Sequence, residues 1–155
     1  MKNVNIQYFV EGEDEKKLLN TLKNQLGVIQ PGKVQILNVV QSKIPMNIIR
    51  TLKKGTIVVL VFDTDTGNTD ILNSNLKLLN ECLFISKVVT IPQVKNLEDE
   101  LVRSCNIRDI TELLNSRSKK DYKSDLIRVT NLDCKLKEHK FDINLFWSKQ
   151  PDTPY

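Results

Sequence analysis

Two carboxylates, Asp63 and Asp65, stand two positions apart directly after an apolar run, Ile57 to Phe62. Like charges held at close range raise each other's pKa unless a cation lies between them. Carboxylate oxygens are hard ligands, which suit Mg²⁺ or Mn²⁺. We therefore expect a divalent metal at Asp63 and Asp65. The alternative is a strand that ends in an Asp/Thr/Gly turn, a common composition for loops.

The apolar run is the element that must position these acids. It is mostly β-branched, too short to span a membrane and too continuous for a surface strand, so it suits a strand buried on both faces of a parallel sheet. Ligands of open α/β sheets bind beyond the carboxyl ends of the strands. Glu11 ends an earlier predicted strand, and Gly12 after it would let the backbone approach a phosphate or metal closely. We expect Glu11 to converge with Asp63 and Asp65, although an acid that begins a helix usually caps it or complements its dipole.

A fourth candidate acid, Glu98, is indicated by helix geometry. At about 100° per residue, Glu98 falls within the apolar face formed by Leu97 and Leu101, whereas Asp99 and Glu100 point away. A carboxylate on an apolar face is disfavoured unless a cation, a base or a metal receives it. The alternative is a cap at the helix start, or a side chain that turns outward.

Basic residues gather late in the chain. From residue 115 to residue 149 there are nine Lys or Arg and five acids. A basic helical region beside an acidic metal site would suit a polyanion, although most of these lysines are equally well explained as a solvated face. Lys123 borders the apolar positions Tyr122, Leu126 and Val129 of one predicted helix, so we select it as the lysine that contacts a scissile phosphate.

Strands and helices are predicted to alternate through the first two thirds of the chain. The strands are 4–10, 34–40, 57–62 and 86–91; the helices between them are about 13–26, 45–54 and 70–83, with Met46 and Leu83 among their buried positions. Alternation of this kind indicates an α/β fold with a mostly parallel sheet covered on both sides. Beyond Pro92 we expect short helices at 97–105, 110–114, 122–129 and 132–136, then a last helix or apolar plug formed by 141–147.

Composition sets wider bounds. The chain has 155 residues, a net charge of +4, one histidine and three cysteines without C-x-x-C spacing. The charge permits an anionic partner but does not demand one. The cysteines indicate reduced thiols and, with no signal-peptide pattern or long apolar run, a cytoplasmic protein without a membrane association. The single histidine, His139, argues against a zinc site or a histidine-dependent triad.

The motif V-E-G-E-D-E-K at residues 10–16, followed some fifty residues later by an apolar strand and Asp63-Thr64-Asp65, resembles a Toprim domain. This is the catalytic domain shared by topoisomerases, bacterial primases, OLD-family nucleases and small ribosomal-RNA-maturing nucleases. The form at residues 10–16 is most similar to the last two branches, and the match covers about residues 3 to 105.

The resemblance implies a Rossmann-like fold of about four parallel strands, over residues 1–105, with residues 106–155 as a small helical extension packed on it. It implies one or two Mg²⁺ ions, with Glu11 as a general acid/base or metal-linked acid and Asp63 and Asp65 as metal ligands. Glu98 resembles a further metal-binding acid of OLD-type enzymes. The implied function is a metal-dependent nuclease acting on DNA or RNA. No P-loop Gly-x-x-x-x-Gly-Lys occurs, so an ATPase partner would be a separate chain.

Three other interpretations remain open. Phe62-Asp63-Thr64-Asp65 also resembles the nucleophile motif of haloacid-dehalogenase-like phosphatases. However, that motif has a Thr where Gly67 stands here, and the late acidic pair of that family is missing. A Toprim-like chain could instead be a non-catalytic or partner-dependent subunit of a regulatory or defence system. The third interpretation is a plain α/β binding domain whose acids are caps and turns.

Overall fold

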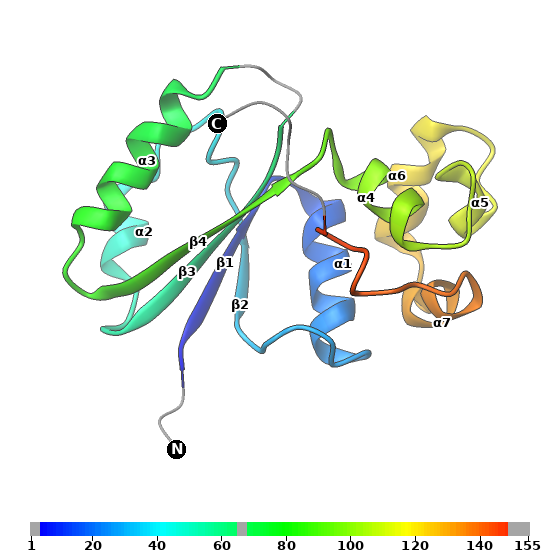
Figure 1. Ribbon diagram of the computed structural model, residues 1–155, viewed down its shortest axis with the longest axis horizontal. Coiled ribbons are helices and arrows are strands. Elements are labelled where there is room, and N and C mark those ends of the chain that lie inside the picture. The colour runs from blue at the N-terminus through cyan, green and yellow to red at the C-terminus, as the bar shows by residue number, and fades with distance from the viewer. Residues whose placement is uncertain (1–3, 65–67, 149–155) are drawn as a thin grey trace.

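The computed structural model describes residues 4–64 and 68–148 (Figure 1). Its strands are β1 (Ile6–Val10), β2 (Lys33–Ile36), β3 (Thr56–Asp63) and β4 (Ile85–Gln93). Its helices are α1 (Glu13–Asn24), α2 (Met46–Arg50), α3 (Asp70–Glu81), α4 (Leu97–Ser104), α5 (Thr111–Leu114), α6 (Lys119–Arg128) and α7 (Leu132–Glu138). The chain is therefore an α/β protein, as its alternating pattern predicts.

The four strands form one parallel sheet in the order β2-β1-β3-β4. The apolar run of β3 is central, with its positions 58–62 buried, because β1 and β4 flank it and helices cover both faces. All strands run the same way, so their carboxyl ends share one edge. In register, Phe9 lies opposite Leu60, and Asp63 lies opposite Gln93.

Successive residues of a strand face opposite sides of the sheet, and two apolar layers result. One layer packs under α2 and α3 and contains Phe9, Val58, Leu60, Phe62, Leu72 and Leu79. The other packs under α1 and contains Tyr8, Val10, Leu19, Val59 and Val61. Figure 1 shows α2 and α3 on one side of the sheet and α1 on the other.

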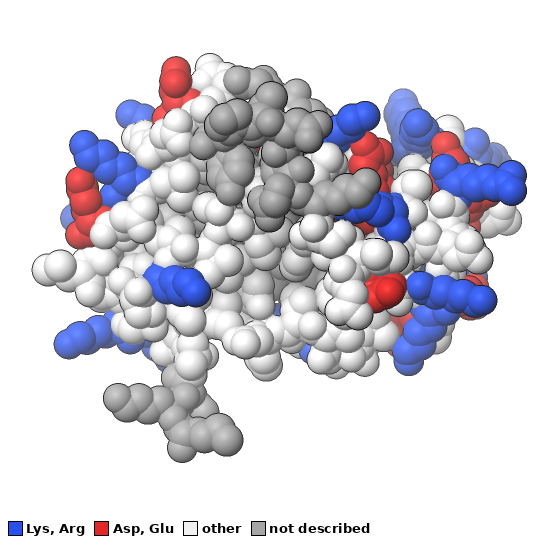
Figure 2. Space-filling view, in the orientation of Figure 1, with Lys and Arg blue, Asp and Glu red and all other residues white. Residues whose placement is uncertain are grey.

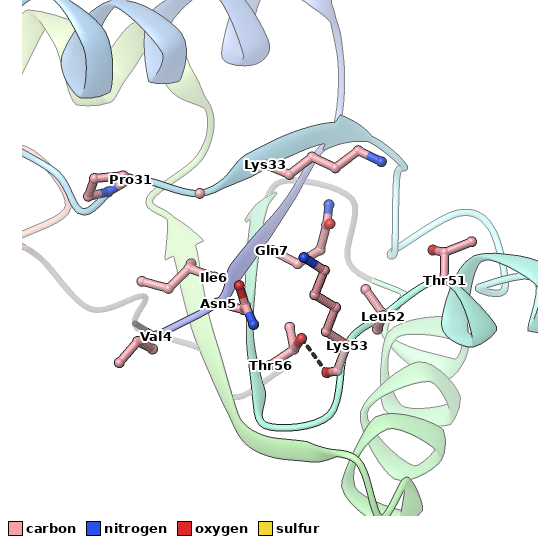
Figure 3. A pocket seen from close by; sticks show the side chains of 11 residues that line it. Val4, Asn5, Ile6, Gln7, Pro31, Lys33, Thr51, Leu52, Lys53 and Thr56 are labelled. Atoms are coloured by element: carbon pink, nitrogen blue, oxygen red, sulfur yellow. Dashed lines mark hydrogen bonds between the residues drawn. The ribbon is translucent and has the colours of Figure 1, made fainter. Parts of the chain in front are cut away.

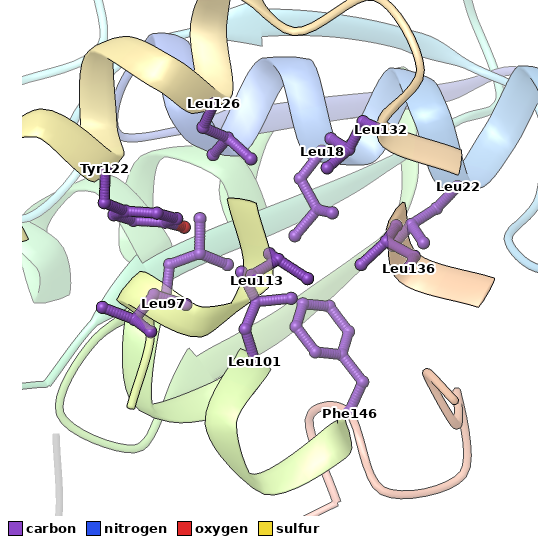
Figure 4. Close-up of a cluster of buried hydrophobic side chains, with 11 residues drawn as sticks. Leu18, Leu22, Leu97, Leu101, Leu113, Tyr122, Leu126, Leu132, Leu136 and Phe146 are labelled. Carbon is purple, nitrogen blue, oxygen red and sulfur yellow. The ribbon is translucent and has the colours of Figure 1, made fainter. Parts of the chain in front are cut away.

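The C-terminal helices pack on the outer side of α1. We call α4 to α7 with residues 139–148 the helical lobe. Its core combines Leu18 and Leu22 of α1 with Leu97, Leu101, Ile110, Leu113, Tyr122, Leu126, Leu132, Leu136 and Phe146 (Figure 4). The Lys17 ammonium of α1 also donates to the carbonyl of Val129, at 2.6 Å, just beyond the end of α6. A cation at a helix C-terminus is favourable because the last carbonyls lack partners within the helix.

Some local expectations were wrong. Met46 is 49% exposed and Leu83 is 99% exposed, although both were expected on buried helix faces. Helix α3 ends at Glu81, so Leu83 lies outside the helix and does not share its buried face, contrary to the prediction from the spacing of the leucines. Residues 141–147, expected as a last helix or an apolar plug, contain turns and no helix, and they form the plug. Phe146 is only 4% exposed, and Phe141, Ile143 and Trp147 pack against the same core.

Two compositional expectations can be compared with the structure. All three cysteines, Cys82, Cys105 and Cys134, have free thiols. Within residues 4–64 and 68–148, no helix combines the length and the apolar character needed to cross a membrane.

Candidate metal centre

Three carboxylates meet at the carboxyl edge of the sheet. Glu11 follows the last residue of β1, and Asp63 is the last residue of the neighbouring strand β3. The backbone N–H of Asp63 donates to Oε1 of Glu11 at 2.9 Å. Together with Glu15, each offers a carboxylate oxygen, and these oxygens all lie within 4.8 Å of one another. The predicted convergence of Glu11 and Asp63 is therefore present.

Glu15 is the member of this cluster that sequence reasoning missed. Acids in the first turn of a helix are ordinarily explained by the helix dipole, which needs no burial. However, Glu15 precedes Leu18 by three positions and Leu19 by four, so it shares their face of the helix. All three are buried, and Glu15 is only 4% exposed. The spacing of Glu15 from two leucines was thus the signal that could have identified it.

The environment of Glu15 opposes its ionisation. Burial, followed by the hydrogen bond and charge of Asp14, raises the pKa of Glu15 from 4.5 to about 9, and the charge of Asp63 adds to the shift. A carboxylate crowded in this way is stabilised by a cation placed among its neighbours. A divalent metal bound among the three carboxylates would consequently reduce the repulsion between them.

Side chains of the neighbouring strand fix the end of β3. Gln93 Nε2 donates to Oδ1 of Asp63 at 2.7 Å. The hydroxyl of Thr64 donates to the carbonyl of Gln93 at 2.8 Å and accepts from the backbone N–H of Lys95 at 3.2 Å. The position of Asp63 is therefore set by contacts from β4 as well as from Glu11.

The other described candidates, Gly12, Glu98 and Lys123, line the same cavity as the cluster. This cavity of about 200 Å³ is bounded by Glu11, Gly12, Asp14, Glu15, Asn38, Asp63, Glu98 and Lys123. Lys123 Nζ lies 3.9 Å from Oε1 of Glu98. A carboxylate that faces both a lysine and an acidic cluster can hold a cation or orient the ammonium.

Gly12 matters here because of space rather than backbone conformation. Its backbone is extended, with a φ of −154°, which any residue adopts. A Cβ at this position would lie 3.2 Å from Oδ1 of Asp14 and 3.3 Å from Oε2 of Glu15, which is tighter than an ordinary contact. The glycine thus leaves room for the carboxylates, which refines the expectation that it admits a ligand.

Helix geometry predicted that Glu98 is buried and Glu100 exposed, but the structure shows Glu100 to be the more buried of the two. The side chain of Glu98 is 21% exposed, whereas Glu100, expected to point away, is fully buried. Glu100 is paired with Arg103 and accepts the backbone N–H of Trp147 at 2.9 Å. The reason is tertiary, because residues 140–148 cover a side of α4 that an isolated helix would expose.

Asp65 lies outside the described residues, as does Gly67. The expectation that Asp65 binds the metal beside Asp63 therefore stays a prediction.

A second cavity of about 390 Å³ adjoins the first. Asp63, Glu98 and Lys123 border both cavities. The second extends between α4 and α6 and is also lined by Asn96, Asp99, Val102, Arg108, Asp109, Ile110 and Lys119. Figure 2 shows basic side chains over the helical lobe, on the right, with acidic ones among them. On this face, the lobe thus has local positive groups beside acids rather than one continuous basic surface.

The cavity in Figure 3 lies at the opposite edge of the sheet. It measures about 450 Å³ and is lined by the amino ends of β1 to β3 and by Pro31, Thr51 and Leu52, among others. None of the residues that line it is acidic, and its charged groups are Lys33 and Lys53. Of these two edges, only the carboxyl edge therefore has a cluster of acids that could hold a metal ion.

The residues present fit a divalent metal. Oxygens on one octahedral Mg²⁺ lie about 3.0 Å apart when adjacent and about 4.2 Å apart when opposite, because each bond is about 2.1 Å. The three carboxylates, whose oxygens lie within 4.8 Å of one another, would move inward to share one ion. Near these acids, Tyr122 is fully buried in the core of the helical lobe, and its hydroxyl has no hydrogen-bond partner among the described residues. Burial, followed by the charges of Glu98, Asp14 and Glu15, raises the pKa of Tyr122.

No protein-family model matches this chain, and neither a curated protein nor a solved structure matches it. The interpretation of the site consequently depends on its own geometry.

Proposed function

We propose that this chain is a metal-dependent nuclease that hydrolyses phosphodiester bonds of nucleic acid. The observation that carries the proposal is the meeting of Glu11, Glu15 and Asp63, with oxygens within 4.8 Å of one another. They lie at the carboxyl edge of a parallel sheet, where α/β proteins bind their ligands. The resemblance of residues 10–16 and 63–65 to Toprim nucleases is a second, sequence-based support.

Glu11, Glu15 and Asp63 would hold a Mg²⁺ or Mn²⁺ ion, with Asp65 as the further ligand that the sequence suggests. A metal so held polarises a phosphate oxygen and lowers the pKa of a bound water. Glu11 accepts the backbone N–H of Asp63 through Oε1, so its carboxylate is oriented before any substrate arrives. An oriented carboxylate can accept the proton of an attacking water.

Lys123 would contact the scissile phosphate. Its side chain is 64% exposed and lies opposite Glu98, on the wall of the cavity that contains the three acids. Glu98, predicted from the sequence as a metal ligand, would hold this ammonium in place or bind a second ion. A cation beside a developing phosphorane charge stabilises the transition state.

We infer nucleic acid as the substrate from the cations of the neighbouring cavity, which lie among four acids, Asp63, Glu98, Asp99 and Asp109. Arg108, Lys119 and Lys123 line it, and it opens beside Asp63. Phosphates that flank the scissile bond would lie against these cations, and Val102 and Ile110 offer an apolar wall for a base. The resemblance to OLD-family nucleases implies a separate ATPase chain as a partner.

The test is a cleavage assay combined with metal titration. Purified protein meets single- and double-stranded DNA and RNA with Mg²⁺, Mn²⁺ or EDTA, and Mn²⁺ binding is measured by calorimetry. Asp63→Ala and Glu11→Ala should each lower cleavage at least about a hundredfold, because losing a metal contact removes several kcal/mol of transition-state stabilisation. Lys123→Ala should lower cleavage as well.

Matched controls are available on the surface. Asp70 and Lys120 are exposed and line neither cavity beside the acids. Asp70→Ala and Lys120→Ala should therefore cleave like the wild type. Metal binding without cleavage of any nucleic acid would favour a partner-dependent or regulatory subunit. Hydrolysis of a phosphomonoester that requires Asp63 but not Glu11 would favour the phosphatase, and absence of metal binding would remove the proposed centre.

A further inference from the structure

The only tryptophan of the chain, Trp147, is connected to the acidic cluster through one intervening side chain. Its indole Nε1–H donates to Oε1 of Gln93 at 3.2 Å. Gln93 in turn donates from Nε2 to Oδ1 of Asp63 at 2.7 Å. A continuous series of hydrogen bonds therefore leads from residues 140–148 to the end of β3.

The order of donors in this series is chemically determined. Swapping the oxygen and nitrogen of a glutamine amide changes the shape very little, so its hydrogen bonds decide its orientation. An indole N–H can only donate, and an ionised carboxylate can only accept. Gln93 is fully buried, so its amide has little access to water. Trp147 therefore obliges the amide to present its oxygen to the indole and its N–H group to Asp63.

The backbone of Trp147 is itself held in place. Its φ of 61° lies in the left-handed region, which a tryptophan rarely adopts. Its backbone N–H donates to Oε1 of the buried Glu100 at 2.9 Å, and its ring packs on Phe146 with centroids 4.5 Å apart. Asp142 N–H donates to the carbonyl of Ser104 at 2.9 Å and ties the same segment to the end of α4.

From these contacts we propose that Gln93 and Trp147 are positioning residues that fix the carboxylate of Asp63 for metal binding. The proposal depends on the proposed metal centre and adds the residues that preorganise it. Carboxylates that bind metals are oriented by such outer hydrogen bonds, and losing one typically weakens metal affinity about 10- to 100-fold. The helical lobe thereby contributes to a site whose three clustered acids lie on α1 and at the ends of β1 and β3.

The first test needs no metal. Because Trp147 is the only tryptophan, its indole N–H gives one resonance in a ¹⁵N–¹H spectrum. In EDTA, Gln93→Met and Asp63→Asn should both move this resonance, since one removes the acceptor and the other changes the charge behind it. If neither substitution changes the chemical shift of the indole resonance, the proposal is overturned.

Gln7 provides a matched control for the glutamine substitution. It is also buried, at 6% exposed, on the neighbouring strand β1, but it lies towards the opposite edge of the sheet and donates only locally to Tyr8. Gln7→Met should leave the indole resonance of Trp147 and the metal affinity close to those of the wild type, even if it alters stability.

The second test measures Mn²⁺ affinity by electron paramagnetic resonance. Gln93→Met should weaken binding about tenfold or more, and Trp147→Phe, which keeps an aromatic ring against Phe146, should weaken it by a smaller factor. If the wild type binds Mn²⁺ and both variants bind it with the same affinity, the positioning role would be overturned. If the wild type binds no Mn²⁺, the metal centre and the positioning role fail together. The indole resonance alone would then decide whether Trp147 is coupled to Asp63.

Discussion

At the scale of single residues, Glu15 should make the stability of the metal-free protein depend on pH. Its pKa is raised from 4.5 to about 9 by burial and by Asp14. Below about pH 4.5 both folded and unfolded chains hold the proton, and the contribution of Glu15 to stability is complete. Between 4.5 and about 9 the unfolded chain releases the proton while the folded chain keeps it. This contribution is therefore lost as the pH rises.

We expect the free energy of unfolding in EDTA, measured with urea, to be larger at pH 5 than at pH 8. One group changes it by at most about 1.4 kcal/mol per pH unit. Glu15→Gln should flatten this dependence, whereas Glu13→Gln, an exposed acid of the same helix, should leave it in place. A dependence that persists unchanged in Glu15→Gln would contradict the raised pKa.

The residue scale also shows what the sequence could and could not reveal. Glu11 and Asp63 could be brought together from sequence, because parallel strands place their carboxyl ends on one edge and both acids follow apolar strands. Glu15 was within reach, since its spacing from Leu18 and Leu19 already placed it on the buried face. The burial of Glu100 could not be predicted, because it is hydrogen-bonded to Trp147, which lies 47 positions further along the chain.

At the scale of elements, the close pairing of β1 and β2 depends on Gly32. A Cβ on Gly32 would lie 2.5 Å from the carbonyl oxygen of Ile6 and 2.9 Å from its Cβ. Both are parts of a paired strand and cannot rotate aside, so the strands would have to separate. Gly32→Ala should therefore lower the free energy of unfolding by about 1–3 kcal/mol, as other overpacking substitutions do.

Gly12→Ala is the control for this prediction, measured in the same urea titration. Its Cβ would meet only the ends of the Asp14 and Glu15 side chains, at 3.2 and 3.3 Å, and these can move. We expect a smaller loss of stability there. Equal losses at the two glycines would argue against a steric role for the strand contact.

The elements themselves followed from periodicity where the pattern was strong. The four strands and the α1, α3 and α4 helices lie where alternation and three-to-four spacing place them, within a few residues. Residues 141–147, expected as a last helix or an apolar plug, form the plug. Their apolar side chains are arranged by the surface that they cover, which local spacing does not encode.

At the scale of the whole molecule, the apolar core crosses the predicted boundary at residue 105. Leu18 and Leu22 of α1 and Leu97 of α4 pack with Leu126 of α6 and with Phe146, all fully or almost fully buried. Residues 106–148 therefore share their core with the sheet-bearing part rather than forming a core of their own. We expect the two parts to unfold together.

Leu126→Ala tests this coupling. Its side chain is fully buried, so its truncation should lower the free energy of unfolding by about 2–5 kcal/mol. Trp147 fluorescence reports the lobe and circular dichroism reports all helices and strands, and the two should give one coincident transition in urea. The matched control is Leu83→Ala, because Leu83 is 99% exposed and its truncation should change the free energy of unfolding by no more than about 0.5 kcal/mol.

If Trp147 fluorescence changed at a lower urea concentration than circular dichroism in Leu126→Ala, the lobe would unfold by itself, and the sheet would not need the lobe to fold. The acids would then remain on an intact sheet edge while Gln93 had lost its partner, a state in which metal affinity should fall before the sheet unfolds.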